Sequence, residues 1–309
     1  MPRILVVAPN WIGDALMAQP LLARLAGAEI DIIAPPWVAP VMRRMPEVSS
    51  VIDTPFRHGP LQLRERWAFA RVLKKKDYSQ AFVLPNTWKS ALIPFFAGIP
   101  RRTGYVGEAR YGLLNDARKA PEAPMSEHYA RLAGDGPLSQ PRLRVSAEEI
   151  EQAKRKFAIA ARYAVLCPGA EYGPAKRWPY FADLSRQMAL PAVALGSAKD
   201  REASGGINGT DLTGRTSLDE AIALIAGADY VVSNDSGLMH IAAALGRPQV
   251  ALFGSSSPLH TPPASPAARV LWLHIECSPC YQRECPLGHF RCMKEMGVEM
   301  VLNQLKTVS

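Results

Sequence analysis

The sequence predicts an α/β fold in two halves, each built around a parallel β-sheet. The 309 residues give room for two ordinary domains, each with its own core. In both halves, apolar segments of strand length alternate with amphipathic segments of helix length, which is typical of βαβ units. Hydrophobic residues make up 48% of the chain and charged residues 21%, as in ordinary folded domains.

The first half is predicted to begin with a βαβ unit. Residues 3–8 form a strand, residues 9–14 a polar turn, residues up to about Ala26 a helix, and residues 29–34 the next strand. The turn lacks the G-x-G-x-x-G pattern of dinucleotide-binding proteins, and dinucleotide binding is therefore only weakly supported. Asp14 falls in the first helical turn, where it either compensates the helix dipole or acts as a carboxylate base at the mouth of the sheet.

Basic residues are concentrated in the first half. Residues 1–160 contain 23 Lys and Arg against 15 Asp and Glu, whereas residues 161–309 contain 13 of each, so the first half holds the whole net charge of +8. A largely helical segment ends in Lys74-Lys75-Lys76, and Lys89 follows a strand predicted at residues 81–84. Such charge usually marks a solvated face. Its recurrence beside strand ends favours an anionic partner: nucleic acid, an acidic membrane surface or a phosphorylated ligand.

The second half repeats the α/β alternation, after a proline-rich connection at residues 119–145 and a helix at residues 148–160. Strands are predicted at residues 163–167 and 192–196, and residues 211–214 form another polar strand end. Lys176 lies in the loop after the first of these strands, and Ser197 and Asp200 follow the second. Glycine, hydroxyl, Lys and Asp side chains at successive strand ends outline a cleft for a nucleoside diphosphate.

The most informative pattern lies at residues 230–254. A buried strand leads through a polar turn into a helix, which ends at Gly246 before a second buried strand. The turn carries Asp235-Ser236-Gly237, and the unpaired amides that open the helix can hold an anion, which glycine lets approach closely. His240 falls one turn further, where it can reach the same anion. Alternatively, Asp235 caps the helix and His240 is an ordinary surface residue.

Location and metal binding can also be predicted from composition. No apolar run reaches the length of a membrane span, and residues 1–8 are predicted to be a strand rather than a signal peptide, so we expect a cytoplasmic protein. Four of the five cysteines cluster near the C-terminus, at Cys277, Cys280, Cys285 and Cys292. In a cytoplasmic chain such a cluster suggests a metal before disulfides, although the spacing is not that of a standard paired zinc knuckle. Structural zinc and reduced, packed thiols both stay open.

Five segments of the sequence resemble the family 9 glycosyltransferases. These segments are residues 10–14 (NWIGD), 84–116 (beginning LPNTWKS), 167–179 (CPGAEYGPAKRWP), 233–254 (SNDSGLMHIAAALGRPQVALFG) and 277–293 (CSPCYQRECPLGHFRCM). They span nearly the whole chain in the family's order, which makes chance matching implausible.

The resemblance implies a GT-B architecture, in which two Rossmann-like parallel-sheet domains face a central cleft. We expect an acceptor-binding domain at residues 1–160, a nucleotide-sugar-binding domain at residues 161–290, and a C-terminal helix at residues 291–309 that packs back on the first domain. The resemblance also implies an inverting glycosyltransferase of lipopolysaccharide inner-core biosynthesis in the Gram-negative cell envelope. Its donor would be ADP-heptose, which supplies L-glycero-D-manno-heptose, and its acceptor heptosyl-Kdo2-lipid A.

The expected partners and location follow from that acceptor. We expect a cytoplasmic monomer that associates peripherally with the inner membrane, binds no nucleic acid and requires no metal cofactor for its chemistry. Type I or III heptosyl transfer is an alternative within the family. A GT-B-fold nucleotide-sugar epimerase is a more distant alternative, for which we find no additional acid and base residues.

The resemblance also assigns roles to the residues singled out above. Asp14 is expected to be the catalytic base, and Lys176 is expected to stabilise the departing diphosphate. The expected donor-binding residues are Ser197, Asp200, Thr213, Asp235, Ser236, Gly237 and His240. The expected acceptor-binding residues are Asn10, Arg64, Lys89 and Arg101.

Overall fold

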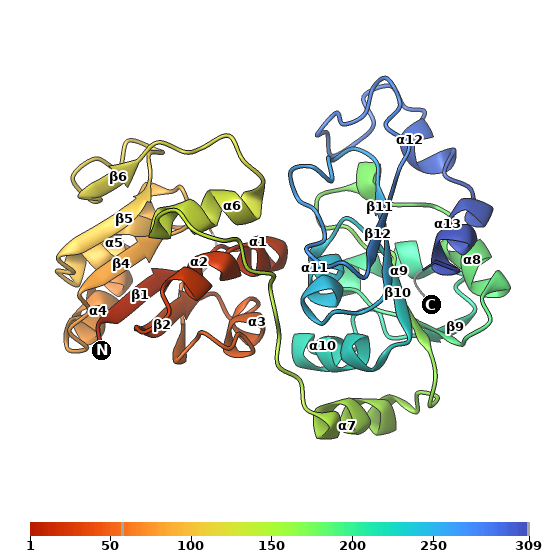
Figure 1. Ribbon diagram of the computed structural model, residues 1–309, viewed down its shortest axis with the longest axis horizontal. Helices are drawn as coiled ribbons and strands as arrows, with labels where there is room; N and C mark the ends of the chain where they lie inside the picture. Colours follow the sequence, from red (N-terminus) through yellow and green to blue (C-terminus); the bar gives the residue numbers. More distant parts are fainter. Residues whose placement is uncertain (57–58, 308–309) are drawn as a thin grey trace. The chain divides into compact units, whose positions relative to one another are not determined.

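The protein consists of two compact α/β units, each with its own parallel sheet (Figure 1). The computed structural model describes residues 1–56 and 59–307. The first unit comprises Met1–Gln140 and the second Pro141–Ser309. The prediction of two parallel-sheet halves is therefore confirmed.

The first unit contains a six-stranded parallel sheet in the order β3-β2-β1-β4-β5-β6. Its strands are β1 (Arg3–Val7), β2 (Glu29–Ala34), β3 (Ser50–Asp53), β4 (Gln80–Val83), β5 (Arg101–Tyr105) and β6 (Asp116–Arg118). Its helices are α1 (Ile12–Met17), α2 (Gln19–Arg24), α3 (Ala39–Arg43), α4 (Leu63–Lys74), α5 (Trp88–Phe96) and α6 (Met125–Ala130), with the 3-10 turn η1 (Arg131–Ala133). Beyond their first residues, the central strands β1 and β2 are buried, because helices cover both faces of a parallel sheet.

The second unit repeats this topology, in the order β12-β11-β10-β7-β8-β9. Its strands are β7 (Ala164–Cys167), β8 (Ala192–Ala194), β9 (Gly209–Asp211), β10 (Tyr230–Asn234), β11 (Gln249–Phe253) and β12 (Ala268–Trp272). Its helices are α7 (Ala147–Phe157), α8 (Phe181–Gln187), α9 (Arg201–Ser204), α10 (Leu218–Gly227), α11 (Gly237–Ala244), α12 (Arg291–Lys294) and α13 (Val298–Leu305), with 3-10 turns η2 (Pro174–Lys176) and η3 (Ala198–Asp200).

Each sheet has one point at which the strand order reverses. The chain builds outward from β1 and then returns to place β4 on its other side, and it does the same with β7 and β10. The loops that leave two such strands at their carboxyl ends diverge, so a crevice forms there, and ligands of open α/β sheets bind in that crevice. The carboxyl ends of β1 and β4, and of β7 and β10, are therefore the places to look for a site.

The C-terminal segment packs on the core of the second unit. Met293, Met296, Val301 and Leu305 belong to one buried cluster with Trp178 and other residues of the second unit. Helix α13 contacts α8 and β11, and Figure 1 shows it beside α8. The apolar face of a short helix must be buried somewhere, and here the nearby second core accepts it.

The boundary between the units also differs from the predicted one at residue 160. Helix α7 packs against α10 of the second unit, and Gly227 of α10 lies so close to Ile150 that a Cβ there would stand 2.6 Å from its Cγ2. With the boundary after Gln140, the first unit holds 18 Lys and Arg against 12 Asp and Glu, and the second holds 18 against 16. The first unit is still the more basic, but it does not hold the whole charge excess. Among the described residues, no helix is long and apolar enough to cross a membrane.

Candidate functional site

The carboxyl edge of the second sheet brings together the residues predicted to hold the donor diphosphate, which we call the cradle: Lys176, Asp235, Ser236, Gly237 and His240. Lys176 lies in the loop after β7, and Asp235 directly follows β10, the strand paired with β7. The Lys176 Nζ donates to Asp235 Oδ2 at 2.5 Å, and the Ser256 hydroxyl donates to the same oxygen at 2.5 Å. Asp235 is 7% exposed, so its charge is held between these two donors and fixes the position of the Lys176 ammonium.

Helix α11 begins at Gly237 with its first amides free of side-chain caps. Ser236 occupies the N-cap position but forms no capping hydrogen bond, and Asp235 does not cap the helix. The buried Oγ of Ser236 has no hydrogen-bond partner among the described residues. Because buried hydroxyls are normally paired, this atom and the open amides are available to a ligand at the positive end of the helix.

His240 lies inside α11, not on the protein surface. It is 6% exposed and close enough to Asp235 and Lys176 for both to affect its titration. Burial lowers the pKa of His240 to about 4; Asp235 opposes this shift and Lys176 adds to it. At neutral pH the imidazole is therefore uncharged, so it can offer one N–H donor, whereas Lys176 supplies the positive charge.

A second group of predicted donor residues lies on the other side of β7. The Ser197 N–H and hydroxyl donate to Asp200 Oδ2 at 2.9 and 2.7 Å, and the buried Thr213 follows β9. A Cβ added to Gly169 would stand 2.2 Å from the Asp200 Cγ. Asp200 therefore fills the space that a glycine leaves at the end of β7. Asp200 thus joins the loop after β7 to the loop after β8, and the Ser197 side chain stays exposed.

The carboxyl edge of the first sheet carries Asn10 and Asp14. Asn10 is half-buried in the turn after β1, and its carbonyl accepts from the Trp37 indole N–H at 2.8 Å. Asp14 lies in the first turn of α1, half-buried. Its neighbour is Tyr129 of α6, whose pKa is raised by burial and further by the charge of Asp14. The carboxylate thus stands at the strand-order reversal of this sheet, as a base for a bound hydroxyl requires.

The other three predicted acceptor residues do not lie together. Lys89 opens α5 at the carboxyl edge, where its Nζ donates to the Gly59 carbonyl at 3.0 Å, and Arg64 is exposed in the first turn of α4. Arg101, however, begins β5 and pairs with Gln80, the first residue of β4. It lies at the amino edge of the sheet and forms an ion pair with Asp116 at 2.9 Å. This position does not support a shared acceptor site with Asp14.

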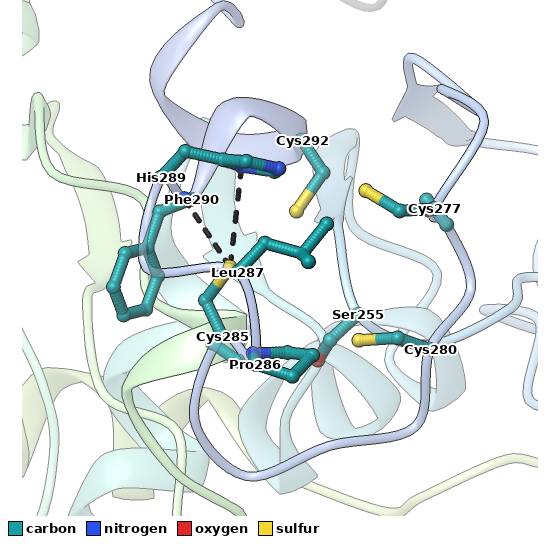
Figure 2. A pocket seen from close by; sticks show the side chains of 11 residues that line it. Ser255, Cys277, Cys280, Cys285, Pro286, Leu287, His289, Phe290 and Cys292 are labelled. Atoms are coloured by element: carbon teal, nitrogen blue, oxygen red, sulfur yellow. Dashed lines mark hydrogen bonds between the residues drawn. The ribbon is translucent and has the colours of Figure 1, made fainter.

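The cysteine cluster lines a small cavity behind the Lys176 loop. Figure 2 shows the four thiols directed toward this cavity, which Ala175 and Ser255 also line. Burial, and secondarily the three other thiols, raises the pKa of Cys292 to about 11. Within the described part of the chain, no three His, Cys, Asp or Glu side chains are grouped so that they could hold a metal ion.

The loop that carries the cysteines is tied to the cradle by its backbone. The Arg283 carbonyl accepts from the Ala175 N–H at 3.0 Å, and the Tyr281 carbonyl accepts from the Tyr172 hydroxyl at 2.5 Å. The Lys176 Nζ lies 5.0 Å from the centre of the Tyr172 ring. The cysteine loop therefore supports the segment that presents Lys176.

Sequence reasoning missed two residues of the cradle. Ser256 fixes Asp235, and Asn234 joins the loops by donating to the Pro168 carbonyl at 2.7 Å and accepting from the Trp178 N–H at 3.1 Å. Asn234 could have been found, because a buried amide at a strand end needs partners. Ser256 lies in a run of three serines and gives no local signal.

Comparisons with a family model, with known protein sequences and with solved structures all point to the same family. A family model described as glycosyltransferase family 9 (heptosyltransferase) matches residues 66–291. Lipopolysaccharide heptosyltransferase 2 of Escherichia coli (strain K12) and that of Salmonella typhimurium are each 42% identical to this chain, covering 99% of it and 98% of the relative. The solved structure of E. coli ADP-heptose lps heptosyltransferase II matches with a TM-score of 0.88 at 40% identity, covering 99% of this chain and 98% of that one.

Proposed function

The chain belongs to glycosyltransferase family 9, and from this premise we propose that it transfers L-glycero-D-manno-heptose from ADP-heptose to heptosyl-Kdo2-lipid A. The transfer inverts the configuration of the anomeric carbon. The observation that carries the proposal is the ion pair of Lys176 with the buried Asp235 beside the open start of α11, at the strand-order reversal of the second sheet. Near full-length similarity to type 2 enzymes favours the heptosylated acceptor over the acceptors of types I and III.

The second unit is proposed to hold the donor. As the bond from the sugar to the diphosphate breaks, negative charge develops on ADP and must be stabilised where it forms. Lys176 supplies a positioned cation, the amides of Ser236 and Gly237 supply oriented N–H groups, and neutral His240 can donate one more hydrogen bond. Ser197 and Thr213 are proposed to lie near the ribose and adenine, and Asp200 to fix that loop.

The first unit is proposed to activate the acceptor. Inverting transfer needs one base to remove the proton of the attacking hydroxyl, and Asp14 is proposed to take it onto its carboxylate. Asn10 and Lys89 at the same edge are proposed to position the acceptor, with Lys89 facing a Kdo carboxylate. The acceptor is lipid-anchored, so the enzyme is proposed to work as a cytoplasmic protein at the inner membrane.

The cysteine loop is proposed to act as a scaffold for the donor side and not as a centre of chemistry. Its carbonyls hold the Lys176 segment, and the Tyr281 N–H donates to the Ser255 carbonyl at 2.7 Å. No metal is proposed to take part in turnover.

Replacing the proposed base tests this function directly. Asp14→Asn should reduce transfer by at least about a hundredfold, since it removes the proton acceptor. ADP affinity by calorimetry should stay close to that of the unsubstituted protein, because Asp14 lies in the other unit from the proposed donor site. Retained turnover, or loss of ADP binding, contradicts the assignment.

A further inference from the structure

Helix α4 combines large apolar side chains with basic ones on its outer face. Leu63, Trp67 and Val72 are 48%, 50% and 63% exposed. At about 100° per residue, these three positions fall within one half of the helix circumference. The same half holds four exposed basic residues: Arg64, Arg71, Lys74 and the C-cap Lys75. Glu65, at the edge of this half, is the one acidic residue in the helix.

Some basic residues around α4 are held by contacts within the fold, and others are exposed to solvent. Arg66 is 7% exposed, lies 4.4 Å from the centre of the Phe56 ring and donates to the Leu61 carbonyl, so it stabilises the fold. Lys76 forms an ion pair with the buried Asp31 at 3.1 Å. The basic residues of the outer face, in contrast, are exposed, and the Arg71 guanidinium lies 4.9 Å from the centre of the Trp67 ring.

The neighbouring helix α5 adds aromatic residues. It packs against α4, and the Arg66 guanidinium donates to the Lys89 carbonyl at 3.3 Å. Trp88 and Phe95, seven positions apart and therefore on one stripe of α5, are 41% and 42% exposed. Tryptophan, phenylalanine and leucine thus face outward on two helices that lie side by side in the more basic unit.

This combination fits a lipid surface better than a nucleic acid. Tryptophan is favoured at the depth of lipid headgroups, and Lys and Arg beside it are attracted to anionic lipids. Phosphate contacts of nucleic acids would use the basic residues but would leave Leu63 and Val72 without a role. We propose that the outer face of α4, extended by Trp88 and Phe95, docks on an anionic lipid bilayer.

The proposal deepens the proposed function, since it names the surface that would bring the enzyme to a lipid-anchored acceptor. It is tested first without any substrate, by sedimentation with vesicles of phosphatidylcholine with or without phosphatidylglycerol. The full chain should bind the anionic vesicles, and added salt should weaken binding. Lys74→Gln/Lys75→Gln should lower the partition coefficient on anionic vesicles by about tenfold or more. Trp67→Ser should lower it on both kinds of vesicle.

A matched control removes two exposed arginines from the second unit. Arg155→Gln/Arg201→Gln changes the net charge by the same amount, and its vesicle binding should equal that of the unsubstituted protein. If the partition coefficient on anionic vesicles falls equally in this control and in the lysine variant, the proposal is overturned, because the effect is then one of net charge alone. Binding to RNA without binding to anionic vesicles overturns it as well.

Transfer assays separate this inference from the function on which it rests. The lysine and Trp67 variants should retain full transfer to a delipidated, water-soluble heptosyl-Kdo2 oligosaccharide and lose transfer to the same core embedded in vesicles. If these variants lose transfer to the soluble acceptor as well, the residues belong to the substrate site, and the proposed docking surface is wrong. Absence of transfer by the unsubstituted protein to either acceptor contradicts the proposed function, while the sedimentation result still decides the surface.

Discussion

The Lys176–Asp235 pair allows a test that separates catalysis from fold stability. Their side chains are 16% and 6% exposed. Among the described residues, Lys176→Met therefore leaves the buried carboxylate with the Ser256 hydroxyl as its remaining side-chain donor. Removing one partner of a buried pair costs about 3 kcal/mol or more of the free energy of unfolding. In a unit of this size, that loss lowers the melting temperature by roughly 6–12 °C.

The same substitution should reduce turnover for a different reason. Loss of a positioned charge at the departing diphosphate lowers kcat by about 10²–10³-fold. Lys176→Met/Asp235→Asn removes the stranded carboxylate as well, so most of the stability should return while kcat stays low. Calorimetric melting and a coupled assay of ADP release measure the two effects on the same samples.

Two results would refute the reasoning. If kcat recovers in the double variant, Lys176 serves to neutralise Asp235 and does not act on the diphosphate. If Lys176→Met melts like the unsubstituted protein, the pair is not a buried one. The control is Lys199→Met, which breaks an exposed pair with Glu171 in the same unit and should cost at most about 1 kcal/mol with kcat unchanged.

Three further predictions concern acid stability, metal and acceptor binding. Burial lowers the pKa of His240 from its ordinary value of 6.5 to about 4 in the folded protein. Between these two values the unfolded chain binds more protons than the folded one, so stability falls as pH falls. His240→Gln should flatten this slope of the free energy of unfolding by up to about 1.4 kcal/mol per pH unit; an unchanged slope in acid urea titrations contradicts the buried, neutral imidazole. Chelation, followed by elemental analysis, should leave kcat unchanged; a stoichiometric metal whose removal abolishes turnover in a folded protein contradicts the scaffold role of the cysteine loop. Lys89→Met should raise the acceptor KM and leave the donor KM unchanged, whereas Arg101→Gln should alter neither; an effect of Arg101→Gln on the acceptor KM would return that residue to the site.

Local pattern predicted the central βαβ unit well. Residues 230–254 give β10, α11 and β11, and the polar turn falls at the carboxyl edge because parallel strands all point that way. Apolar runs of strand length and a Gly-Arg-Pro stop signal are local features, so they are visible without tertiary structure. The residues that contact each other in the cradle are far apart in the sequence. The pairing of β11 with β10 brings Ser256 to Asp235, and no local pattern predicts this contact.

Arg101 was expected to bind the acceptor, but its strand places it at the amino edge of the sheet, away from Asp14. Strand β5 reads RRTGY and carries no apolar run, so the sequence pattern predicts neither this strand nor the edge of the sheet at which Arg101 lies. Helix α7 posed a similar problem, since its single buried residue, Ala153, gives little indication of which core it joins. The cysteine spacing likewise could not give the positions of the thiols, because the chain between Cys277 and Phe290 is an irregular loop.

Mass spectrometry of the acceptor after incubation with ADP-heptose and the protein tests the central claim most directly. Heptosyl-Kdo2-lipid A should gain one heptose in proportion to the ADP released, and Kdo2-lipid A without its first heptose should gain none. The Asp14→Asn protein, which should still bind ADP, should produce no shift in mass. Addition to Kdo2-lipid A, or no addition to the heptosylated acceptor by the unsubstituted protein, would contradict the account.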